Sequence, residues 1–435
     1  MQSNLETISS LERRLSIAVS MQEVNSEVAN RLKRLSQTVK MHGFRPGKVP
    51  VKIVEQQYGG QVRQEVLGDA IQKSFGDAVR EQNLRVAGLP KIEVQSGDET
   101  AGQFEYTATF EIYPEVELGD LTALSIEKPV VEVGDAEIDK TIEVLRKQRA
   151  VFEPVQRAAA TGDQVKMDYR GTIGGEAFDG GSAEGSTVQL GEGRLLPDFE
   201  SNVIGLSAGE STTFNLTFPE DYHGKEVAGK EARFEISVHE VLEPRLPEVD
   251  AEFAKALGVV DGDLDKMRTD IRANLEREVG RRTSARVKDQ VMKALLDSTS
   301  VDLPQALVEQ EAERLAEQMK QDLQSRGLKA ENVPLPHEAF DEEARRRVRL
   351  GLIVSEVVDK HGLRAKPEQI KEVVEEQAKA YEQPEEVRRW YYQSPDRLRE
   401  MESVVLEANL VEWVTGQAKV QEKPTAFDDL MGNTK

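Results

Sequence analysis

The chain has 435 residues, a formal net charge of −22, and 31% charged residues. At roughly 100–200 residues per domain this length predicts two to four domains, while the acidic balance argues against general affinity for nucleic acids through phosphate contacts. The chain has no cysteine, five scattered histidines and no long uncharged apolar run, so the sequence predicts no thiolate chemistry, no metal site, no cofactor and no membrane-spanning helix.

The first 115 residues predict a compact α+β domain. Residues 12–20 alternate polar and apolar side chains, as a half-buried strand does. Apolar residues then recur at spacings of three and four, which predicts an amphipathic helix that stops at Gly43. These apolar residues are Val24, Val28, Leu32, Leu35 and Val39. More helix is expected to about Asn83, followed by strands over 91–95 and 103–112.

The same region carries a local positive patch on an otherwise acidic chain. Residues 116–245 hold 13 basic and 25 acidic residues, whereas residues 1–115 hold 14 and 15. Between Arg31 and Val54 there is no acidic residue. The basic residues of this segment are Arg31, Lys33, Arg34, Lys40, Arg45, Lys48 and Lys52. Residues 43–50 within it have too many glycines and prolines for regular structure, which predicts an exposed loop.

The rest of the chain changes character twice. Residues 116–151 hold one extended and one helical piece that could not form a core alone, so they are expected to be a connector that packs with the C-terminal body. Residues 152–245 are rich in glycine and short strand-like runs separated by turns, which predicts a small antiparallel β domain. Residues 246–435 contain long helical segments interrupted by prolines, which predicts an all-α body.

Within the β domain, five short motifs occur in order. They are Asp168-Tyr169-Arg170-Gly171, Phe178-Asp179-Gly180-Gly181, Leu195-Leu196-Pro197-Asp198-Phe199, Phe218-Pro219-Glu220-Asp221-Tyr222 and Arg233-Phe234-Glu235-Ile236. In this order and at these gaps, residues 152–245 resemble the FKBP-type peptidyl-prolyl isomerases. The resemblance implies a curved sheet around one short helix, and an enzyme that isomerises X–Pro peptide bonds.

The resemblance also implies which side chains surround the proline. In this chain they are Tyr169, Phe178, Asp179, Leu195, Leu196, Phe199, Tyr222 and Phe234. Rotation about an X–Pro bond loses amide resonance, against a barrier of about 18–20 kcal/mol, and it requires no nucleophile or proton shuttle. A dry aromatic wall should favour the less polar twisted amide, while Asp179 acts as a hydrogen-bonding and electrostatic group at the rim.

Two observations qualify this assignment. The alternative interpretation of the aromatic residues is that they are simply the core of a small β domain. The stretch after Tyr222 is also shorter than the long, proline-containing loop of the smallest FKBPs. We expect this shortening to alter peptide preference and weaken inhibitor binding without removing isomerisation.

The loop at residues 43–50 carries a second resemblance. Its sequence, Gly43-Phe44-Arg45-Pro46-Gly47-Lys48-Val49-Pro50, follows a basic helix and is similar to the ribosome-docking signature of the trigger factor family. These chaperones meet nascent chains at the bacterial ribosome exit tunnel. With the FKBP-like module following at residue 152, the resemblance spans essentially the whole chain. The alternative interpretation of this segment is a solvent-exposed basic loop between two helices with no binding role.

The trigger factor resemblance implies the residues that bind the ribosome. They are Gly43, Phe44, Arg45, Gly47 and Lys48. Phe44 is expected to fill a small pocket as an anchor, while the cations attach to rRNA and an acidic protein patch in a salt-dependent way. Some members have Lys where this chain has Pro46, and Lys48 is expected to supply the missing charge.

Together these features predict a multidomain α+β chaperone in the cytoplasm that needs no ATP, since no Walker A motif is present. Its predicted parts are a ribosome-binding α+β domain (1–115), a connector (116–151), an FKBP-type isomerase domain (152–245) and a helical chaperone domain with arms (246–435). Its expected partners are the ribosome at the exit tunnel, through ribosomal protein and rRNA, and nascent or unfolded polypeptides, with no membrane. A homodimer off the ribosome is also expected from the resemblance.

The alternative function is a free peptidyl-prolyl isomerase whose flanking domains only recruit substrates and do not dock on ribosomes. A weaker alternative is a structural adaptor whose β domain has lost activity. The presence of the whole aromatic set at the motif positions argues against that adaptor.

Overall fold

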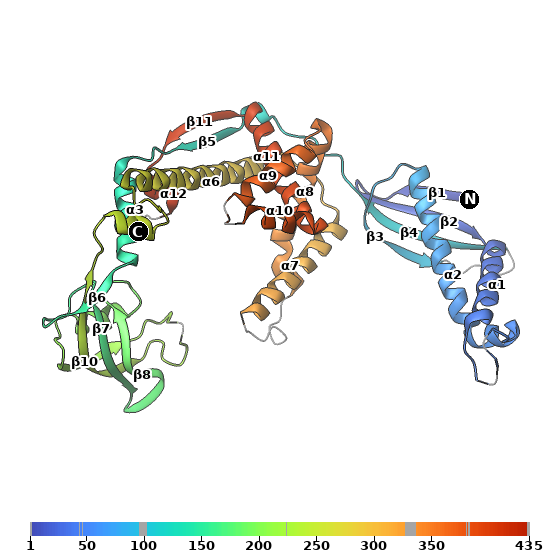
Figure 1. Ribbon diagram of the computed structural model, residues 1–435. Coiled ribbons are helices and arrows are strands. Elements are labelled where there is room, and N and C mark those ends of the chain that lie inside the picture. Colours follow the sequence, from blue (N-terminus) through green and yellow to red (C-terminus); the bar gives the residue numbers. More distant parts are fainter. Residues whose placement is uncertain are drawn as a thin grey trace. The chain divides into compact units, whose positions relative to one another are not determined.

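Figure 1 shows the computed structural model of the chain, which describes residues 2–42, 44–45, 47–94, 102–222, 224–326, 336–379, 381 and 383–432. The chain divides into two compact units. The first unit combines Met1–Lys128 with Ser284–Lys423, and the second combines Pro129–Thr283 with Pro424–Lys435. Because both units are discontinuous in sequence, each requires the C-terminal part of the chain for its completion.

An antiparallel sheet and two helices form the N-terminal part of the first unit. The strand order is β1-β2-β4-β3; α2 lies across the sheet and α1 packs against α2 (Figure 1). The elements are β1 (Gln2–Thr7), β2 (Glu12–Ser20), α1 (Met21–Thr38), α2 (Val51–Glu81), β3 (Val86–Val94) and β4 (Gln103–Ile112). Leu15, Ile17 and Val19 alternate into the core along β2, so this strand has the half-buried pattern that its sequence predicts.

Three details of this region differ from the sequence prediction. Strand β3 begins at Val86, five residues before the strand predicted at 91–95. Strand β1 was not predicted, and it pairs along its length with β2 as an outer strand. Helix α1 ends at Thr38 rather than at Gly43. The reason is that Val39 adopts an extended conformation (φ −66°, ψ 136°) and that Val39 and Met41 pack against the core instead of continuing the helix.

A helical body forms the rest of the first unit. Its elements are β5 (Ser125–Val130), the C-terminal part of α6 (Leu264–Ser298), α7 (Gln305–Ser325), α8 (Asp341–His361), α9 (Pro367–Ala378), α10 (Pro384–Tyr392), α11 (Pro395–Gln417) and β11 (Lys419–Pro424). Its core joins Ile126 of β5 to Leu295 of α6, Ile353 of α8 and Leu410 of α11, all fully buried. The connector therefore contributes apolar side chains to the core of the body.

One element of the C-terminal region is a strand rather than a helix. Strand β11 pairs with β5, and Lys423 of β11 contacts Glu127 of β5 with an Nζ–Oε2 distance of 2.8 Å. The mixed fold class and the helical body are as predicted, but the prediction of an all-α region is wrong for these six residues. Their conformation depends on a partner strand almost 300 residues away, which no local sequence pattern reveals.

The second unit contains a small helical cluster. Its elements are α3 (Asp135–Gln148), α5 (Ala251–Ala256), the N-terminal part of α6 and α12 (Phe427–Met431). Ile138 of α3 and Met267 of α6 are fully buried in its core. The Arg272 guanidinium donates to the Val133 carbonyl and the Asp135 carboxylate, each at 2.8 Å. These bonds tie α6 to the start of α3.

The second unit also contains the predicted β domain. The strand order is β6-β10-β7-β8, β9 also pairs with β10, and all pairs are antiparallel. The elements are β6 (Val151–Pro154), β7 (Gln164–Ile173), β8 (Glu176–Gln189), α4 (Pro197–Val203), β9 (Ser211–Thr217) and β10 (Glu231–Arg245). Helix α4, the one helix among the described residues of this domain, buries Phe199 and Val203 against the sheet. The predicted small antiparallel domain with one short helix is confirmed.

Candidate functional site

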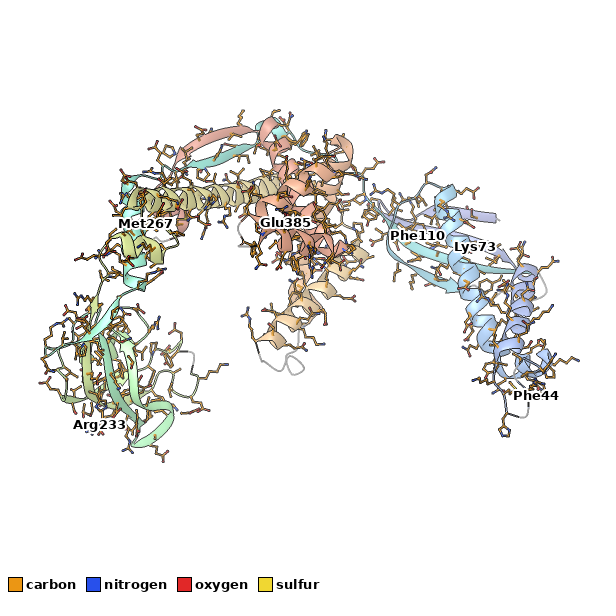
Figure 2. All side chains as sticks on the ribbon, in the orientation of Figure 1. Phe44, Lys73, Phe110, Arg233, Met267 and Glu385 are labelled. Atoms are coloured by element: carbon orange, nitrogen blue, oxygen red, sulfur yellow. The ribbon has the colours of Figure 1, made fainter. Side chains whose placement is uncertain are left out.

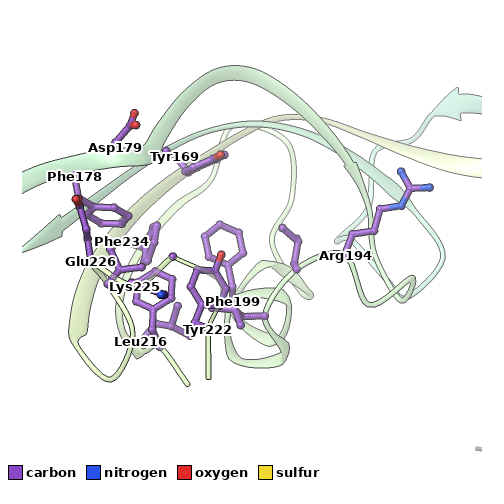
Figure 3. A pocket seen from close by; sticks show the side chains of 16 residues that line it. Tyr169, Phe178, Asp179, Arg194, Phe199, Leu216, Tyr222, Lys225, Glu226 and Phe234 are labelled. Atoms are coloured by element: carbon purple, nitrogen blue, oxygen red, sulfur yellow. The ribbon is translucent and has the colours of Figure 1, made fainter. Parts of the chain in front are cut away.

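A cavity of about 410 Å³ opens on the β domain (Figure 3). The structure brings all eight residues of the sequence prediction into its lining. They are Tyr169 from β7, Phe178 and Asp179 from β8, Leu195 and Leu196 from the loop before α4, Phe199 from α4, Tyr222 from the loop after β9, and Phe234 from β10. Residues from six different parts of the domain therefore converge on one apolar cavity.

Phe234 lies at the centre of the aromatic cluster that forms the floor of the cavity. Its ring centroid is 5.2 Å from that of Phe199 and 6.2 Å from that of Phe178, both in edge-to-face geometry. Phe218, which also lines the cavity, is 5.9 Å from Phe178. Such edge-to-face pairs are worth about 0.5–1.5 kcal/mol each beyond area burial. The floor is therefore held rigidly by ring-to-ring contacts.

Two glycines of the motifs make room for these rings. Gly171 of β7 lies opposite Phe234 in the strand register, and a Cβ atom on Gly171 would lie 2.6 Å from the Phe234 ring and 3.0 Å from the Phe178 ring. A Cβ atom on Gly181 would lie 2.8 Å from the Phe178 ring. The glycines in the Asp-Tyr-Arg-Gly and Phe-Asp-Gly-Gly motifs thus permit the close approach of aromatic side chains to the backbone.

Burial separates the members of the lining into a floor and a rim. Phe199 and Phe234 are 6% and 5% exposed, whereas Tyr169, Phe178 and Tyr222 are half-buried and Asp179 is exposed. The half-buried rings line the cavity and keep part of their surface exposed. The core interpretation of the aromatics therefore holds for Phe199 and Phe234, which belong to the domain core and also line the cavity.

The carboxylate of Asp168 fixes the strand edge next to Tyr169. Asp168 accepts the Gly185 backbone N–H at 2.6 Å, and His239 Nε2 lies 2.8 Å from its other oxygen. The Gly185 N–H, followed by the hydrogen bond with His239, lowers the pKa of Asp168. These contacts link β7 to β8 and β10 at the residue that precedes Tyr169.

The motifs did not reveal every residue of the cavity. The additional lining residues are Gly180, Arg194, Leu216, Phe218, Gly224, Lys225, Glu226 and Val227. Phe218 is the first residue of the motif at 218–222. Leu216 precedes it by two residues, the spacing of side chains on one face of a strand. Both residues could therefore have been predicted from the sequence. Lys225 and Glu226 belong to no motif, and their place depends on the geometry of the loop after Tyr222.

The cavity is lined mainly by apolar groups. Its lining is dominated by aromatic and aliphatic side chains, with charged groups only around the opening. Across the described part of the chain, no group of three or more metal-ligating side chains is positioned to hold an ion. None of the described helices is long and apolar enough to cross a membrane.

The second predicted site is the loop between α1 and α2. Phe44 is 37% exposed, and Arg45 and Lys48 are exposed beside it. Lys48 N–H donates to the Arg45 carbonyl at 3.0 Å, and Gly47 has a φ of +78°, a left-handed value that favours glycine. Figure 2 shows Phe44 at the end of the helical hairpin away from the sheet. Gly43, the remaining predicted residue, lies outside the described residues, as does Pro46.

In the folded chain, acidic side chains pair with part of the basic segment that flanks this loop. The Arg31 guanidinium of α1 donates to the Asp69 carboxylate of α2 at 2.6 Å and to Glu27 at 3.2 Å. The hydrogen bond with Asp69, and then that with Glu27, raises the pKa of Arg31. The run from Arg31 to Val54 has no acid in sequence, but the fold brings one against its first cation. Arg31 is therefore paired, whereas the other six cations of the segment form no ion pair with the described residues.

Comparisons with known proteins agree along the whole chain. The family model of the bacterial trigger factor protein matches residues 1–145, that of the trigger factor C-terminus matches residues 263–416, and that of the FKBP-type peptidyl-prolyl cis-trans isomerases matches residues 155–239. The trigger factor of Nitrosospira multiformis is 55% identical over 435 residues, which is 100% of both chains. That of Nitrosomonas europaea is 51% identical over 99% of this chain and 98% of its own. A solved structure of the trigger factor chaperone covers 96% of this chain and 100% of its own, with 17% identity and a TM-score of 0.48.

Proposed function

The chain belongs to the trigger factor family and is a ribosome-associated chaperone with a peptidyl-prolyl cis-trans isomerase domain; from this premise we propose which of its residues carry each activity. The β domain, proposed as residues 152–245, isomerises proline bonds. The N-terminal domain, proposed as residues 1–115, docks on the ribosome. The body, proposed as residues 246–435 together with the connector 116–151, holds unfolded chain.

We propose that the cavity of the β domain binds the prolyl ring and the twisted amide. The barrier to rotation, about 18–20 kcal/mol, arises because the planar amide loses resonance when it twists. The twisted amide is less polar than the planar one, so an aromatic enclosure that excludes water stabilises it relative to the ground state. Phe178, Phe199 and Phe234 supply this enclosure, and Asp179 is the polar group at the opening. The observation that carries the assignment is the convergence of all eight predicted residues on one cavity.

The experiment that tests this assignment compares two phenylalanines of the same cluster. Phe178 is half-buried and lines the cavity, whereas Phe214 packs on Phe199 and Phe234, with centroid distances of 5.6 and 6.1 Å, without lining it. Phe178→Ala should lower the catalysed exchange rate of an Ala-Pro peptide by about tenfold or more, equivalent to about 1.4 kcal/mol of transition-state stabilisation. Phe214→Ala is the matched control and should retain catalysis wherever it remains folded.

The Phe178→Ala variant also tests whether proline isomerisation and client holding are separate activities. Suppression of the aggregation of an unfolded protein should be unchanged in Phe178→Ala, because we assign client holding to the body. An equal loss of isomerisation and of aggregation suppression in Phe178→Ala would contradict the proposed division. Equal catalysis by wild type and Phe178→Ala would contradict the proposed pocket.

We propose that the loop between α1 and α2 docks on a ribosomal protein and on rRNA beside the exit tunnel. Exposed Phe44 is the apolar anchor, and exposed Arg45 and Lys48 supply the charge that attracts phosphate and acidic side chains. Gly47 permits the left-handed turn between these cations, and Gly43 is assigned to the same site from the motif alone. Docking on the ribosome also places the proposed action in the cytoplasm.

We propose that clients contact exposed aromatic side chains of the body. Helix α10 has no buried residue, and Trp390 and Tyr392 on it are 49% and 50% exposed. Other apolar residues of the body, such as Val308 and Ile353, are 0% exposed and belong to its core. Large exposed apolar side chains suit weak, sequence-tolerant binding of unfolded segments. The same surface supports the proposal that the chain self-associates when it is off the ribosome.

The second candidate function, a free isomerase with no ribosome docking, is supported by the β domain alone. It predicts that charge reversal at Arg45 and Lys48 leaves the distribution of the protein among ribosome fractions unchanged. Our proposal predicts that this variant leaves the ribosome fractions.

A further inference from the structure

Two charged residues at the opening of the cavity have no role in the mechanism described above. Lys225 and Glu226 both line the cavity and are exposed. Among the described residues, neither forms a hydrogen bond or an ion pair through its side chain. Arg194, the other cation of the lining, is instead paired with Glu192 at 3.1 Å. Lys225 and Glu226 therefore remain available to a ligand.

A tight turn fixes these two residues at the opening. Val227 N–H donates to the Gly224 carbonyl at 3.0 Å, so Lys225 and Glu226 occupy the two central positions of a β-turn. Val227 itself is 8% exposed and packs into the domain core, which anchors the turn. The loop that follows Tyr222 is short, and its few residues place this turn directly over the cavity.

The two side chains lie toward different sides of the cavity. Figure 3 shows the Glu226 carboxylate beside Phe178, on the side where Asp179 lies, and the Lys225 ammonium toward Tyr222. Asp179 is also exposed and lines the cavity. The opening therefore has an anionic side, formed by Asp179 and Glu226, and a cationic residue away from it.

We propose that Lys225 and Glu226 select proline sites by the charges of the residues that flank the proline. A peptide whose proline occupies the cavity must leave it in two directions, one toward each chain end, so its two neighbouring residues meet different parts of the opening. Lys225 attracts an acidic neighbour on one side, and Glu226 attracts a basic neighbour on the other. This inference rests on the proposed function of the cavity and adds a substrate class to it.

The expected size of the preference follows from the exposure of these groups. Exposed ion pairs contribute about 0.2–1 kcal/mol, which corresponds to a change of about 1.5- to 5-fold in rate at subsaturating peptide for each pair. Because both side chains are in contact with water, the preference should shrink as salt approaches about 1 M, where the Debye length is about 3 Å. A preference that persisted at high salt would indicate shape selection instead.

The experiment uses two peptides of identical composition, one with Glu before and Lys after the proline, and one with these two residues exchanged. Exchange spectroscopy by NMR gives the catalysed cis–trans rate of each with the full-length chain. Wild type should isomerise one of them about 2- to 30-fold faster at low salt, because each of the two pairs contributes about 0.2–1 kcal/mol. The double variant Lys225→Glu/Glu226→Lys, which conserves net charge, should reverse the order of the two peptides.

A matched control is present in the same domain. Lys230 and Glu231 have the same residue types in the same order, are exposed, and do not line the cavity. Lys230→Glu/Glu231→Lys should keep the wild-type order of the two peptides. Equal rates for both peptides with wild type, or an unchanged order in the Lys225/Glu226 exchange, would overturn the inference.

A third peptide, with Ala on both sides of the proline, distinguishes a failure of charge selection from a failure of the proposed isomerase function of the cavity. Catalysis of the neutral peptide by wild type, together with equal rates for the two charged peptides, refutes charge selection and leaves the isomerase intact. Absence of catalysis for all three peptides refutes the assignment of the cavity itself.

Discussion

Gly171 and Phe234 face each other across the β7–β10 pair, and a Cβ atom at Gly171 would lie 2.6 Å from the Phe234 ring. Real Cβ atoms do not approach other atoms so closely, so one of the two residues would have to move. Phe234 is held by Phe199, Phe178 and Phe218 around it. The packing of the cavity floor therefore requires glycine, which has no Cβ atom, at position 171.

The first prediction concerns this contact. Gly171→Ala should displace the Phe234 and Phe178 rings, destabilise the β domain by about 1–3 kcal/mol through overpacking, and lower proline isomerisation. Loss of amide protection on β7 and β10, measured by hydrogen exchange, should accompany the loss of rate. Thr187→Ala on β8, an exposed position of the same sheet, is the control. Full activity and stability in Gly171→Ala would show that the floor can move freely.

A second prediction concerns the carboxylate of Asp168. Its pKa in the folded chain lies below the ordinary value because it accepts the Gly185 N–H and pairs with His239. The stabilising effect of these contacts is therefore complete above the unfolded-state pKa, about 3.9, and is lost as the pH falls through the lower folded-state pKa. The Gly185 amide proton resonance should titrate with a midpoint below about 3.9.

The Asp168→Asn variant completes this test. It should abolish the acid titration of the Gly185 amide and lower the amide protection of β8 at neutral pH, while acidification should reduce its difference from wild type. A Gly185 midpoint at or above the ordinary value for aspartate would contradict the assigned contacts.

A third prediction concerns Arg31 and its partner on α2. Asp69→Asn removes the carboxylate that holds the Arg31 guanidinium at 2.6 Å and leaves Glu27, at 3.2 Å, as its partner, which raises the net positive charge near the loop between α1 and α2 by one. If rRNA phosphates are contacted here, the slope of log affinity against log salt should steepen by about 0.7–0.9. Asp77→Asn is the matched control, because Asp77 lies on the same helix and pairs with Arg80 by i,i+3. Identical slopes for the two variants would exclude Arg31 from the interface.

The residues of the cavity were predictable from the sequence to different degrees. The eight residues were found through the resemblance to the FKBP-type isomerases, which rests on five motifs in a fixed order. Four of these five motifs combine an aromatic or acidic side chain with a glycine or proline, and the fold brings the motifs together. Lys225 and Glu226 were not found, because their position depends on a turn closed by Val227 and Gly224. A turn of this kind places whichever residues occupy its centre, so residue type carries no signal.

Contacts between residues that are distant in the sequence could not be predicted. The helices and the β domain were recognisable because their periodicity is local, as in β2 with Leu15, Ile17 and Val19. Strand β11 was not, since its strand partner β5 lies far away in the sequence. The pairing of Arg31 with Asp69 was hidden for the same reason, because the acid lies on the neighbouring helix. Such contacts appear only when the chain has folded.

The central claim is that this chaperone docks on ribosomes through the loop between α1 and α2. The measurement that tests it most directly is co-sedimentation with ribosomes over a salt series. Wild type should bind saturably and with strong salt dependence, and Phe44→Ala/Arg45→Ala should lose binding by about tenfold or more, the size of an anchor residue's effect. The control is Leu89→Ala/Lys91→Ala, which removes an exposed apolar residue and a cation from β3 of the same domain and should bind as wild type does. Undiminished binding by Phe44→Ala/Arg45→Ala, or no binding by wild type, would contradict the account.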